Sequence, residues 1–141
     1  NVVQPFVTQD FTLFASDGYI ARHGVPKGED DLADHWFVGA DDISSRAPFF
    51  QWMHATIPLE RIIFRSGDVH AQRRAIQEGA GIGFMSRLHA LEIGDLTEIM
   101  PPRKDWAAPL WLVTHMDLHR TSKVQAFLSF LKERSADWAA I

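Results

Sequence analysis

The chain has 141 residues, of which 46% are hydrophobic, and a formal net charge of −4, values typical of one globular domain with a real core. This charge, with no run of Lys and Arg, gives no general attraction for nucleic acid, so we expect the chain itself not to contact DNA. The lack of cysteine excludes a disulfide framework, and the lack of a secretory signal or of an apolar run of about 18 to 20 residues predicts a cytoplasmic protein with no membrane partner.

The first predicted elements are a strand and a short helix joined by a polar turn. Phe11–Ala15 is an aromatic and β-branched run, and the turn Ser16–Gly18 follows it. We expect Asp17 to cap a helix over Tyr19–His23 that ends at Gly24. The prediction continues with a helical turn at Glu29–His35, a brief strand at Trp36–Val38, and an irregular loop with a packed turn at Gly39–Leu59.

The middle of the chain predicts a strand, a helix and a buried strand. Arg61–Arg65 is the strand, and the turn Ser66–Asp68 begins a helix that runs to about Glu78. Gly79 suits the left-handed position after that helix. The glycines of Gly81–Ser86 permit close backbone approach along a buried strand.

The last third predicts short elements followed by a strand and a long helix. A helical turn is expected at Arg87–Leu91, a short strand at Leu96–Met100, and a strand with a period of two at Leu110–Thr114. A helix capped by Thr121 or Ser122 follows. Its apolar stripe consists of Val124, Phe127, Leu128 and Leu131. The alternation of strands and helices predicts an α/β sheet built from crossover units.

Candidate motifs for nucleotide binding, metal binding and catalysis do not meet the requirements of those functions. Gly79–Phe84 ends a helix and enters a strand, whereas a dinucleotide-binding glycine loop leaves a strand and opens a helix. His115 and His119 would share one metal ion only if both lay on a helix, and the pattern places them at a strand end and in a break. No Gly-x-Ser-x-Gly motif and no carboxylate pair is evident. We therefore expect no cofactor, no metal and no enzymatic activity.

Two polar turns carry a more coherent signal. Ser16–Gly18 and Arg65–Asp68 both follow predicted strands, and both open helices. In open α/β sheets, ligands bind at the carboxyl ends of strands, where free amides and the helix dipole are available. The two turns therefore predict a polar pocket for a small molecule, and ordinary strand-to-helix turns are the alternative.

Four segments form an ordered pattern along about residues 11 to 132. They are Ala21–His35 with its "ARHG-P" and "DLA-H" parts, Ala75–Gly83 with "A…G-GIG", Leu96–Pro101, and Asp117–Leu131. In this order they resemble the effector-binding domain of LysR-type transcriptional regulators. That domain is similar in fold to the type II periplasmic solute-binding proteins.

The resemblance implies an α/β, type II periplasmic-binding-protein-like fold that consists mainly of the second lobe. Lobe two would cover about residues 16–100, the two crossing strands 11–15 and 110–114, and the terminal helix of lobe one 121–138. The DNA-binding domain and most of lobe one would be absent from residues 1–141. The positions that bind effector in the family carry over to Ser16, Arg65, Ser66, Gly67, Asp68 and Phe84.

By the same resemblance, the chain would sense a small-molecule effector in a cleft between lobes and so control DNA binding and transcription by the full-length protein. That protein would self-associate as a dimer or tetramer and contact DNA only through a domain absent from this chain. A solute-binding protein of a transport system is the alternative, because the fold would be shared, and an α/β enzyme fragment is the third reading. Asp68 would oppose an anionic effector unless it points away, and Arg65 would offset it. Without most of lobe one, we expect the stripe of the terminal helix to drive self-association or helix exchange.

Overall fold

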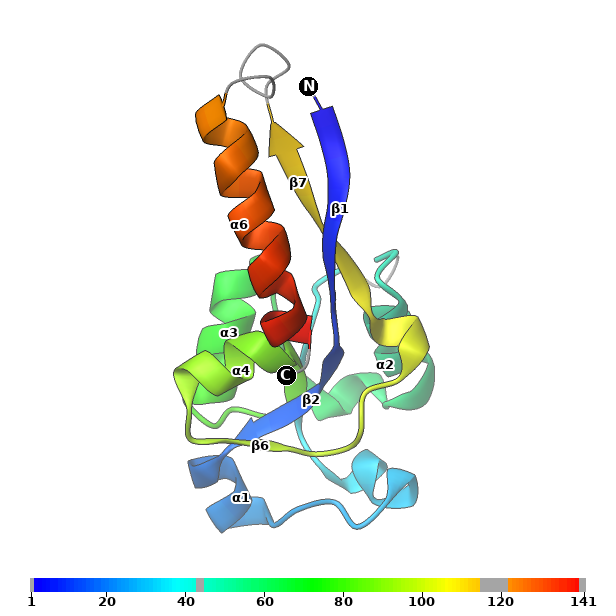
Figure 1. Cartoon of the computed structure of the whole chain (residues 1–141). Coiled ribbons are helices and arrows are strands. Elements are labelled where there is room, and N and C mark those ends of the chain that lie inside the picture. Colours follow the sequence, from blue (N-terminus) through cyan, green and yellow to red (C-terminus); the bar gives the residue numbers. More distant parts are fainter. Residues whose placement is uncertain (1, 43–44, 115–121, 140–141) are drawn as a thin grey trace. The chain divides into compact units, whose positions relative to one another are not determined.

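The computed structural model describes residues 2–42, 45–114 and 122–139, and the chain divides into two compact units. The larger unit is Asp10–Trp106, and the smaller unit combines Asn1–Gln9 with Ala107–Ile141. Helices α1 to α4 and strands β2 to β6 belong to the larger unit (Figure 1). The predictions for His115 and His119 lie outside the described residues. In the described part of the chain, no helix is long and apolar enough to cross a bilayer.

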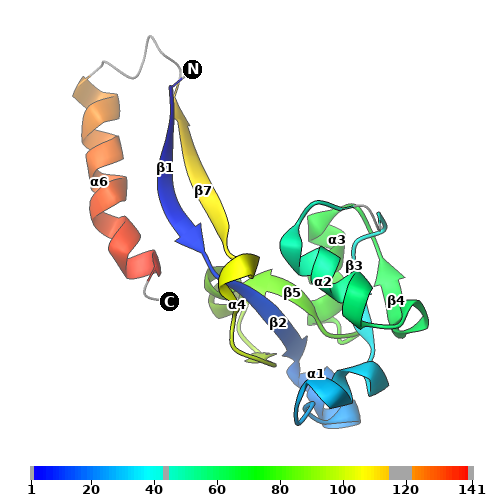
Figure 2. The ribbon, with the colours of Figure 1, turned by 90° about the vertical axis from the view of Figure 1, so that its right-hand side faces the viewer.

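Five strands form the sheet of the larger unit (Figure 2). They are β2 (Phe11–Ser16), β3 (Phe37–Gly39), β4 (Ile62–Arg65), β5 (Gly83–Ser86) and β6 (Leu96–Glu98). β3 and β4 are parallel, and β2 lies between β5 and β6 and runs antiparallel to both. A parallel bridge between Phe37 and Ile82 joins the two groups, so the strand order is β4, β3, β5, β2, β6.

β2 runs opposite to the parallel strands of the sheet, so its carboxyl end and theirs lie at opposite ends of the sheet. Phe11 lies opposite Ser86, and Phe14 lies opposite Gly83. The carboxyl end of β2 therefore lies at the amino ends of the parallel strands β3, β4 and β5. The prediction of crossover units fits the parallel strands and is wrong for β2, because strand direction is set by pairing with segments far away in the sequence.

Both faces of the sheet are covered, because successive side chains of a strand point to opposite sides. One face packs with α1, α2 and η3 through Leu13, Ala15, Tyr19, Phe37, Met53, Phe84 and Trp106. The other face packs with α3 and α4 through Phe14, Val38, Ile76, Met85 and Ala90. The larger unit is thus a three-layer α/β/α structure with a core on each side of the sheet.

The helices of the larger unit agree with most of the predicted helical segments. They are α1 (Asp17–His23), α2 (Pro48–Thr56), α3 (Val69–Gln77) and α4 (Arg87–Ile93), with the short 3-10 turns η1 (Glu29–Asp34), η2 (Leu59–Arg61) and η3 (Lys104–Trp106). Gly79 adopts a φ of 83°, which confirms its predicted left-handed conformation after α3.

Two local predictions are wrong. The segment expected to be a loop with a packed turn contains α2, which begins at Pro48 because the first turn of a helix does not need the N–H that proline lacks. Within α2, Phe49, Trp52 and Met53 recur at helical spacing and join the core. The cap of α1 is Ser16 rather than Asp17, since the Ser16 hydroxyl accepts from the Tyr19 N–H at 3.1 Å.

The smaller unit is a pair of antiparallel strands with one long helix alongside. β1 (Val2–Gln9) pairs with β7 (Ala108–Thr114), and α6 (Ser122–Ala139) packs beside β1 (Figures 1 and 2). The predicted strand and terminal helix are confirmed as elements, whereas β1 was not predicted. The crossing-strand roles given to residues 11–15 and 110–114, and the bounds of the lobes, stay predictions.

The exposed face of α6 differs from the predicted stripe. Leu128 is buried, as the stripe requires, but 59% of Phe127 is exposed. Phe130, which was not assigned to the stripe, is 50% exposed, and the Arg134 guanidinium lies 5.3 Å from the centre of its ring. The side chain of Val124 lies outside the described residues. The helix therefore docks through a narrower apolar face than its spacing predicts.

Candidate functional site

The turn Arg65–Asp68 lies at the carboxyl ends of two parallel strands. Arg65 is paired in register with Gly39 of β3, and the Ser66 N–H donates to the Gly39 carbonyl at 3.2 Å. The turn is therefore beside the segment that leaves β3, which carries Asp41. A ligand at this edge of the sheet would meet both segments.

Hydrogen bonds inside this turn fix its shape. The Ser66 hydroxyl accepts from the Asp68 N–H at 3.0 Å, and the Asp68 carboxylate caps α3 by accepting from the His70 N–H at 2.9 Å. The side-chain amide of Gln72 donates to the Ser66 carbonyl at 2.6 Å. The backbone of the turn is thus held in place by its own neighbours, as a preformed binding site requires.

The turn presents charges of both signs to solvent. Arg65, Gly67 and Asp68 are exposed. A Cβ atom at position 67 would lie 3.2 Å from a carboxylate oxygen of Asp41, so a second acidic group lies against the turn. Because carboxylates only accept hydrogen bonds, this edge suits a ligand with donor groups better than a simple anion. The Asp68 carboxylate is engaged by the cap of α3.

Ser16 lies at the opposite end of the sheet. It is 6% exposed, and its hydroxyl is occupied by the cap of α1. A Cβ atom at Gly79 would lie 3.1 Å from the Ser16 hydroxyl oxygen, and the Arg22 guanidinium donates to the Gly79 carbonyl at 2.7 Å. The structure therefore brings Ser16 together with Gly79 and Arg22, and not with Arg65–Asp68.

A buried tyrosine organises the same end of the sheet as Ser16. The Tyr19 hydroxyl accepts from the Trp36 N–H at 3.1 Å and lies 2.7 Å from Nδ1 of His35. The direction of the bond between the hydroxyl and His35 is set by the tautomer of the His35 ring. Burial lowers the pKa of His35, and the nearby His23 lowers it further. Burial also raises the pKa of Tyr19, so both groups are held in their neutral forms.

Phe84 lies in β5, with β3 between it and the turn at the end of β4. It is 6% exposed, and its ring belongs to an aromatic cluster on the α2 face of the sheet. The aromatic cluster consists of Phe11, Phe49, Phe50, Trp52, Phe84 and Trp106. The ring centre of Phe84 is 5.1 Å from that of Phe49 and 5.0 Å from that of Trp106.

The other members of the aromatic cluster are not among the predicted site residues. The available signal was the helical spacing of Phe49, Trp52 and Met53 after Pro48, which was interpreted as a bulky loop. Had α2 been recognised, its aromatic face would have been expected to cover the sheet. Among the five predicted residues at the turn and in β5, Phe84 is the one that the aromatic rings of α2 and η3 surround.

The described residues at the carboxyl ends provide binding groups. In the described part of the chain, no cluster of three or more His, Asp or Glu side chains is arranged to hold a metal ion. The Ser66 hydroxyl is engaged with a backbone amide in its own turn. Hydrogen bonding to polar groups and packing against aromatic rings are the chemistry that this arrangement supports.

Comparison with known sequences gives a single consistent result. The family described as LysR substrate binding domain matches residues 1–136. The chain is 23% identical over 139 residues to a probable HTH-type transcriptional regulator, LtrA, from Klebsiella pneumoniae. That match covers 92% of this chain and 45% of the relative, so the chain spans about half the length of that relative.

Solved structures show the same fold. The regulatory domain of CrgA, a LysR-type transcriptional regulator from Neisseria meningitidis, matches with a TM-score of 0.68 at 23% identity, over 94% of this chain and 68% of that chain. The effector domain of the transcriptional regulator AmpR of Pseudomonas aeruginosa matches with a TM-score of 0.63 at 16% identity, over 98% of this chain and 67% of that chain. The fold is therefore the periplasmic-binding-protein-like fold of such regulatory domains.

Proposed function

Because this chain belongs to the LysR substrate binding domain family, we propose that it is the effector-sensing part of a longer transcriptional regulator. Binding of a small molecule to this domain would alter DNA binding by a separate domain of the full-length protein. The relatives named above are transcriptional regulators, which are not enzymes, and we extend the proposal to an absence of catalysis here. A regulator that acts on bacterial DNA works in the cytoplasm, where we place this protein.

The effector site that we propose is centred on the carboxyl ends of β3 and β4. The observation that carries this proposal is the preformed turn Arg65–Asp68, whose Ser66 N–H is bonded to the Gly39 carbonyl at the end of β3. Arg65, Ser66, Gly67 and Asp68 supply the polar contacts, and Phe84 with the aromatic cluster supplies apolar cover. The assignment of Ser16 to the effector site stays a prediction, and its position as a buried helix cap does not support it.

The charges around the turn limit the class of molecule that can bind there as the effector. The Asp41 and Asp68 carboxylates accept hydrogen bonds, and the exposed Arg65 guanidinium donates them. A polar molecule with both donor and acceptor groups, and an apolar part that packs on aromatic rings, suits these residues. Amino acids, hydroxylated aromatic acids and sugars fall in this class.

A screen by thermal unfolding tests the effector site. A ligand that binds only the folded state raises the midpoint of unfolding, by an amount set by its concentration relative to Kd. We would screen amino acids, sugars, and aromatic and aliphatic acids with the wild-type chain, then repeat each hit with Arg65→Ala. The matched control is Arg74→Ala, since Arg74 is also exposed, on α3, and its partner is Glu78 at 2.9 Å.

Three outcomes of the screen distinguish the possibilities. A hit supports the site if its apparent affinity is at least tenfold weaker in Arg65→Ala and unchanged in Arg74→Ala. A hit that both variants bind as tightly as the wild type would remove Arg65 from the effector site. A hit that stabilises the chain and is also turned over to product would favour the enzyme reading over the regulator.

A solute-binding protein of a transport system shares the fold and is the second candidate, but the family match favours the regulator. We also propose that the full-length regulator self-associates as a dimer or tetramer and contacts DNA only outside this chain. Sedimentation of the full-length protein measures the first point. Comparison of DNA binding by the full-length protein and by residues 1–141 measures the second.

A further inference from the structure

The larger unit contains a cavity of about 280 Å³ between the segment after α1 and the segment after β6. Pro26 and Leu32 line one side, and Ile99 and Met100 line the other. Leu32 is buried and belongs to the core, so the floor of the cavity is apolar. None of the residues assigned to the effector site lines this cavity.

Backbone hydrogen bonds hold both walls of the cavity. On one side, the Thr12 hydroxyl donates to the Met100 carbonyl at 2.7 Å, and the Ile99 N–H donates to the carbonyl of Leu13 at 2.8 Å. On the other side, the Asp31 carboxylate accepts from the Lys27 N–H at 3.0 Å. Because each wall is tied to its own surroundings, the cavity does not depend on a ligand to stay open.

An ion pair between Glu29 and Arg103 links the two walls at the mouth of the cavity. The Arg103 guanidinium also lies over the rings of Trp52 and Trp106, at 5.4 Å and 5.0 Å from their centres. This linkage connects the mouth of the cavity to the aromatic cluster that contains Phe84.

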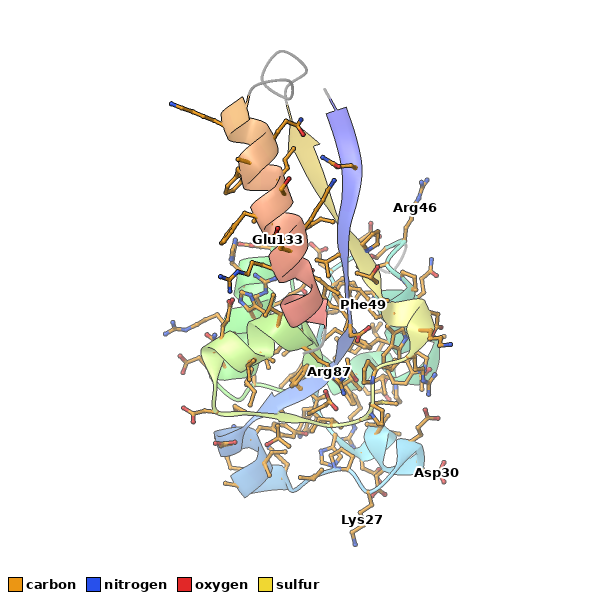
Figure 3. All side chains as sticks on the ribbon, viewed as in Figure 1. Lys27, Asp30, Arg46, Phe49, Arg87 and Glu133 are labelled. Atoms are coloured by element: carbon orange, nitrogen blue, oxygen red, sulfur yellow. The ribbon has the colours of Figure 1, made fainter. Side chains whose placement is uncertain are left out.

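The charges around the mouth disfavour an ionic ligand. The side chains of Lys27 and Asp30 project outward from the molecule (Figure 3). Among the residues that line the cavity, Lys27 and Glu29 are the charged ones, and the Glu29 carboxylate is already paired with Arg103, so the cavity offers no free countercharge to an ion. A neutral molecule needs no countercharge and gains from contact with the apolar floor.

We propose that this cavity is a second binding site of the domain, for a neutral, mostly apolar molecule of about the size of indole. An apolar cavity of about 150 Å³ accepts benzene in proteins, so a volume of about 280 Å³ suits a bicyclic ring. The ion pair between the lining residue Glu29 and Arg103 would link a bound molecule to the aromatic cluster that contains Phe84.

Methyl NMR of the full chain titrated with indole tests the second site. We expect saturable shifts at the methyl groups of Leu32, Ile99 and Met100 at millimolar indole, and at least tenfold weaker binding by Ile99→Phe, whose ring fills the cavity. Ile93→Phe is the matched control, because Ile93 lines a different cavity of about 150 Å³. Indole binding should be unchanged in that control and in Arg65→Ala.

Gly28→Phe is a second blocking variant in case Ile99→Phe unfolds the domain. Gly28 has an extended φ of −177°, and no atom lies within 4 Å of a Cβ built there, so the fold should tolerate the ring. No shift at the three methyl groups, or equal binding by the folded blocking variants and the wild type, would overturn the second site. Because Arg65→Ala retains this site, failure of the effector proposal would leave it standing.

Discussion

Ser16 and Ser66 have similar sequence contexts and opposite surroundings. Ser16 ends β2 and Ser66 follows β4, and each precedes a helix. Ser16 is buried at the end where α1, β3 and β5 meet, and its hydroxyl caps α1. Ser66 is half-buried in a turn whose neighbours Arg65 and Gly67 are exposed. The comparison teaches that a polar residue after a strand can serve a ligand only where the direction of that strand and the packing around it leave it accessible.

The two ends of the sheet can be defined by these residues. The amino end of the parallel strands contains Ser16, Tyr19, His35, Gly79 and Gly81, and the carboxyl end contains the turn Arg65–Asp68 beside Asp41. If the comparison is correct, substitutions at the amino end lower the stability of the larger unit. Substitutions at the carboxyl end should change ligand binding and leave stability nearly intact.

The largest contrast is expected between Gly81→Ala and Gly67→Ala. A Cβ at position 81 would lie 2.9 Å from the Trp36 carbonyl oxygen, which is backbone and cannot turn away. We expect a loss of about 3 kcal/mol in the free energy of unfolding. At position 67 the nearest atom belongs to the exposed Asp41 side chain, so the change should stay within about 0.5 kcal/mol. Urea unfolding measures both, and equal losses would contradict the comparison.

Tyr19→Phe should have the next largest effect. It removes the oxygen that accepts from the Trp36 N–H and is hydrogen-bonded to His35, and leaves those half-buried groups without that partner. We expect a loss of about 2 kcal/mol in the free energy of unfolding. Phe49→Leu at the half-buried edge of the aromatic cluster provides a packing control that removes no hydrogen bond. A wild-type midpoint for Tyr19→Phe would show that the network adds nothing to stability.

Ser16→Ala and Ser66→Ala compare the two serines directly. Loss of the buried cap of α1 should lower the free energy of unfolding by about 1 kcal/mol. Ser66→Ala removes a hydrogen bond in an exposed turn, and we expect a change within about 0.5 kcal/mol together with weaker binding of any ligand found in the screen. Thermal unfolding with and without that ligand separates the two effects. A larger loss of stability in Ser66→Ala than in Ser16→Ala would contradict the assignment of stability to the amino end and of ligand binding to the carboxyl end.

The smallest effect should come from pH. Burial lowers the pKa of His35 below its usual 6.5, so the unfolded chain binds the proton first as the pH falls. The stability contributed by the neutral ring is complete above pH 6.5 and decreases as the pH falls below that value. Burial and the nearby Arg73 lower the pKa of His89 as well, so it acts in the same direction. Urea midpoints from pH 8 down to pH 5 should fall less in His35→Asn than in the wild type, and an identical decline would exclude His35 as a cause.

Local patterns were sufficient for most of the elements. The alternation at Phe11–Ala15, the glycine after α3 and the stripe of α6 each reflect interactions within a few residues, and the corresponding elements are present. β1 was missed because Pro5 interrupts its pattern and its partner β7 is about a hundred residues away. The helix α2 was missed because its surroundings are rich in prolines and serines, although its aromatic spacing was visible.

The candidate site was only partly predictable for the same reason. The turn Arg65–Asp68 was recognised because strand, turn and helix follow each other in the sequence, and β4 does run parallel to β3. The same rule applied to Ser16 assumed a parallel strand, and β2 is antiparallel to both of its neighbours. The aromatic neighbours of Phe84 come from α2 and η3, which no local pattern connects to β5.

By itself, the sequence determined most of the elements, the turn at Arg65–Asp68 and the resemblance to LysR-type sensor domains, since these depend on side-chain periodicity, turn residues and ordered motifs. The tertiary structure alone decided which polar residues share one end of the sheet, which rings surround Phe84 and where the cavity beside Ile99 lies. These features depend on contacts such as the hydrogen bond from Thr12 to Met100, which joins residues separated by 88 positions. Such contacts form only when the sheet is assembled, so strand direction and packing, rather than local pattern, determine which residues can meet a ligand.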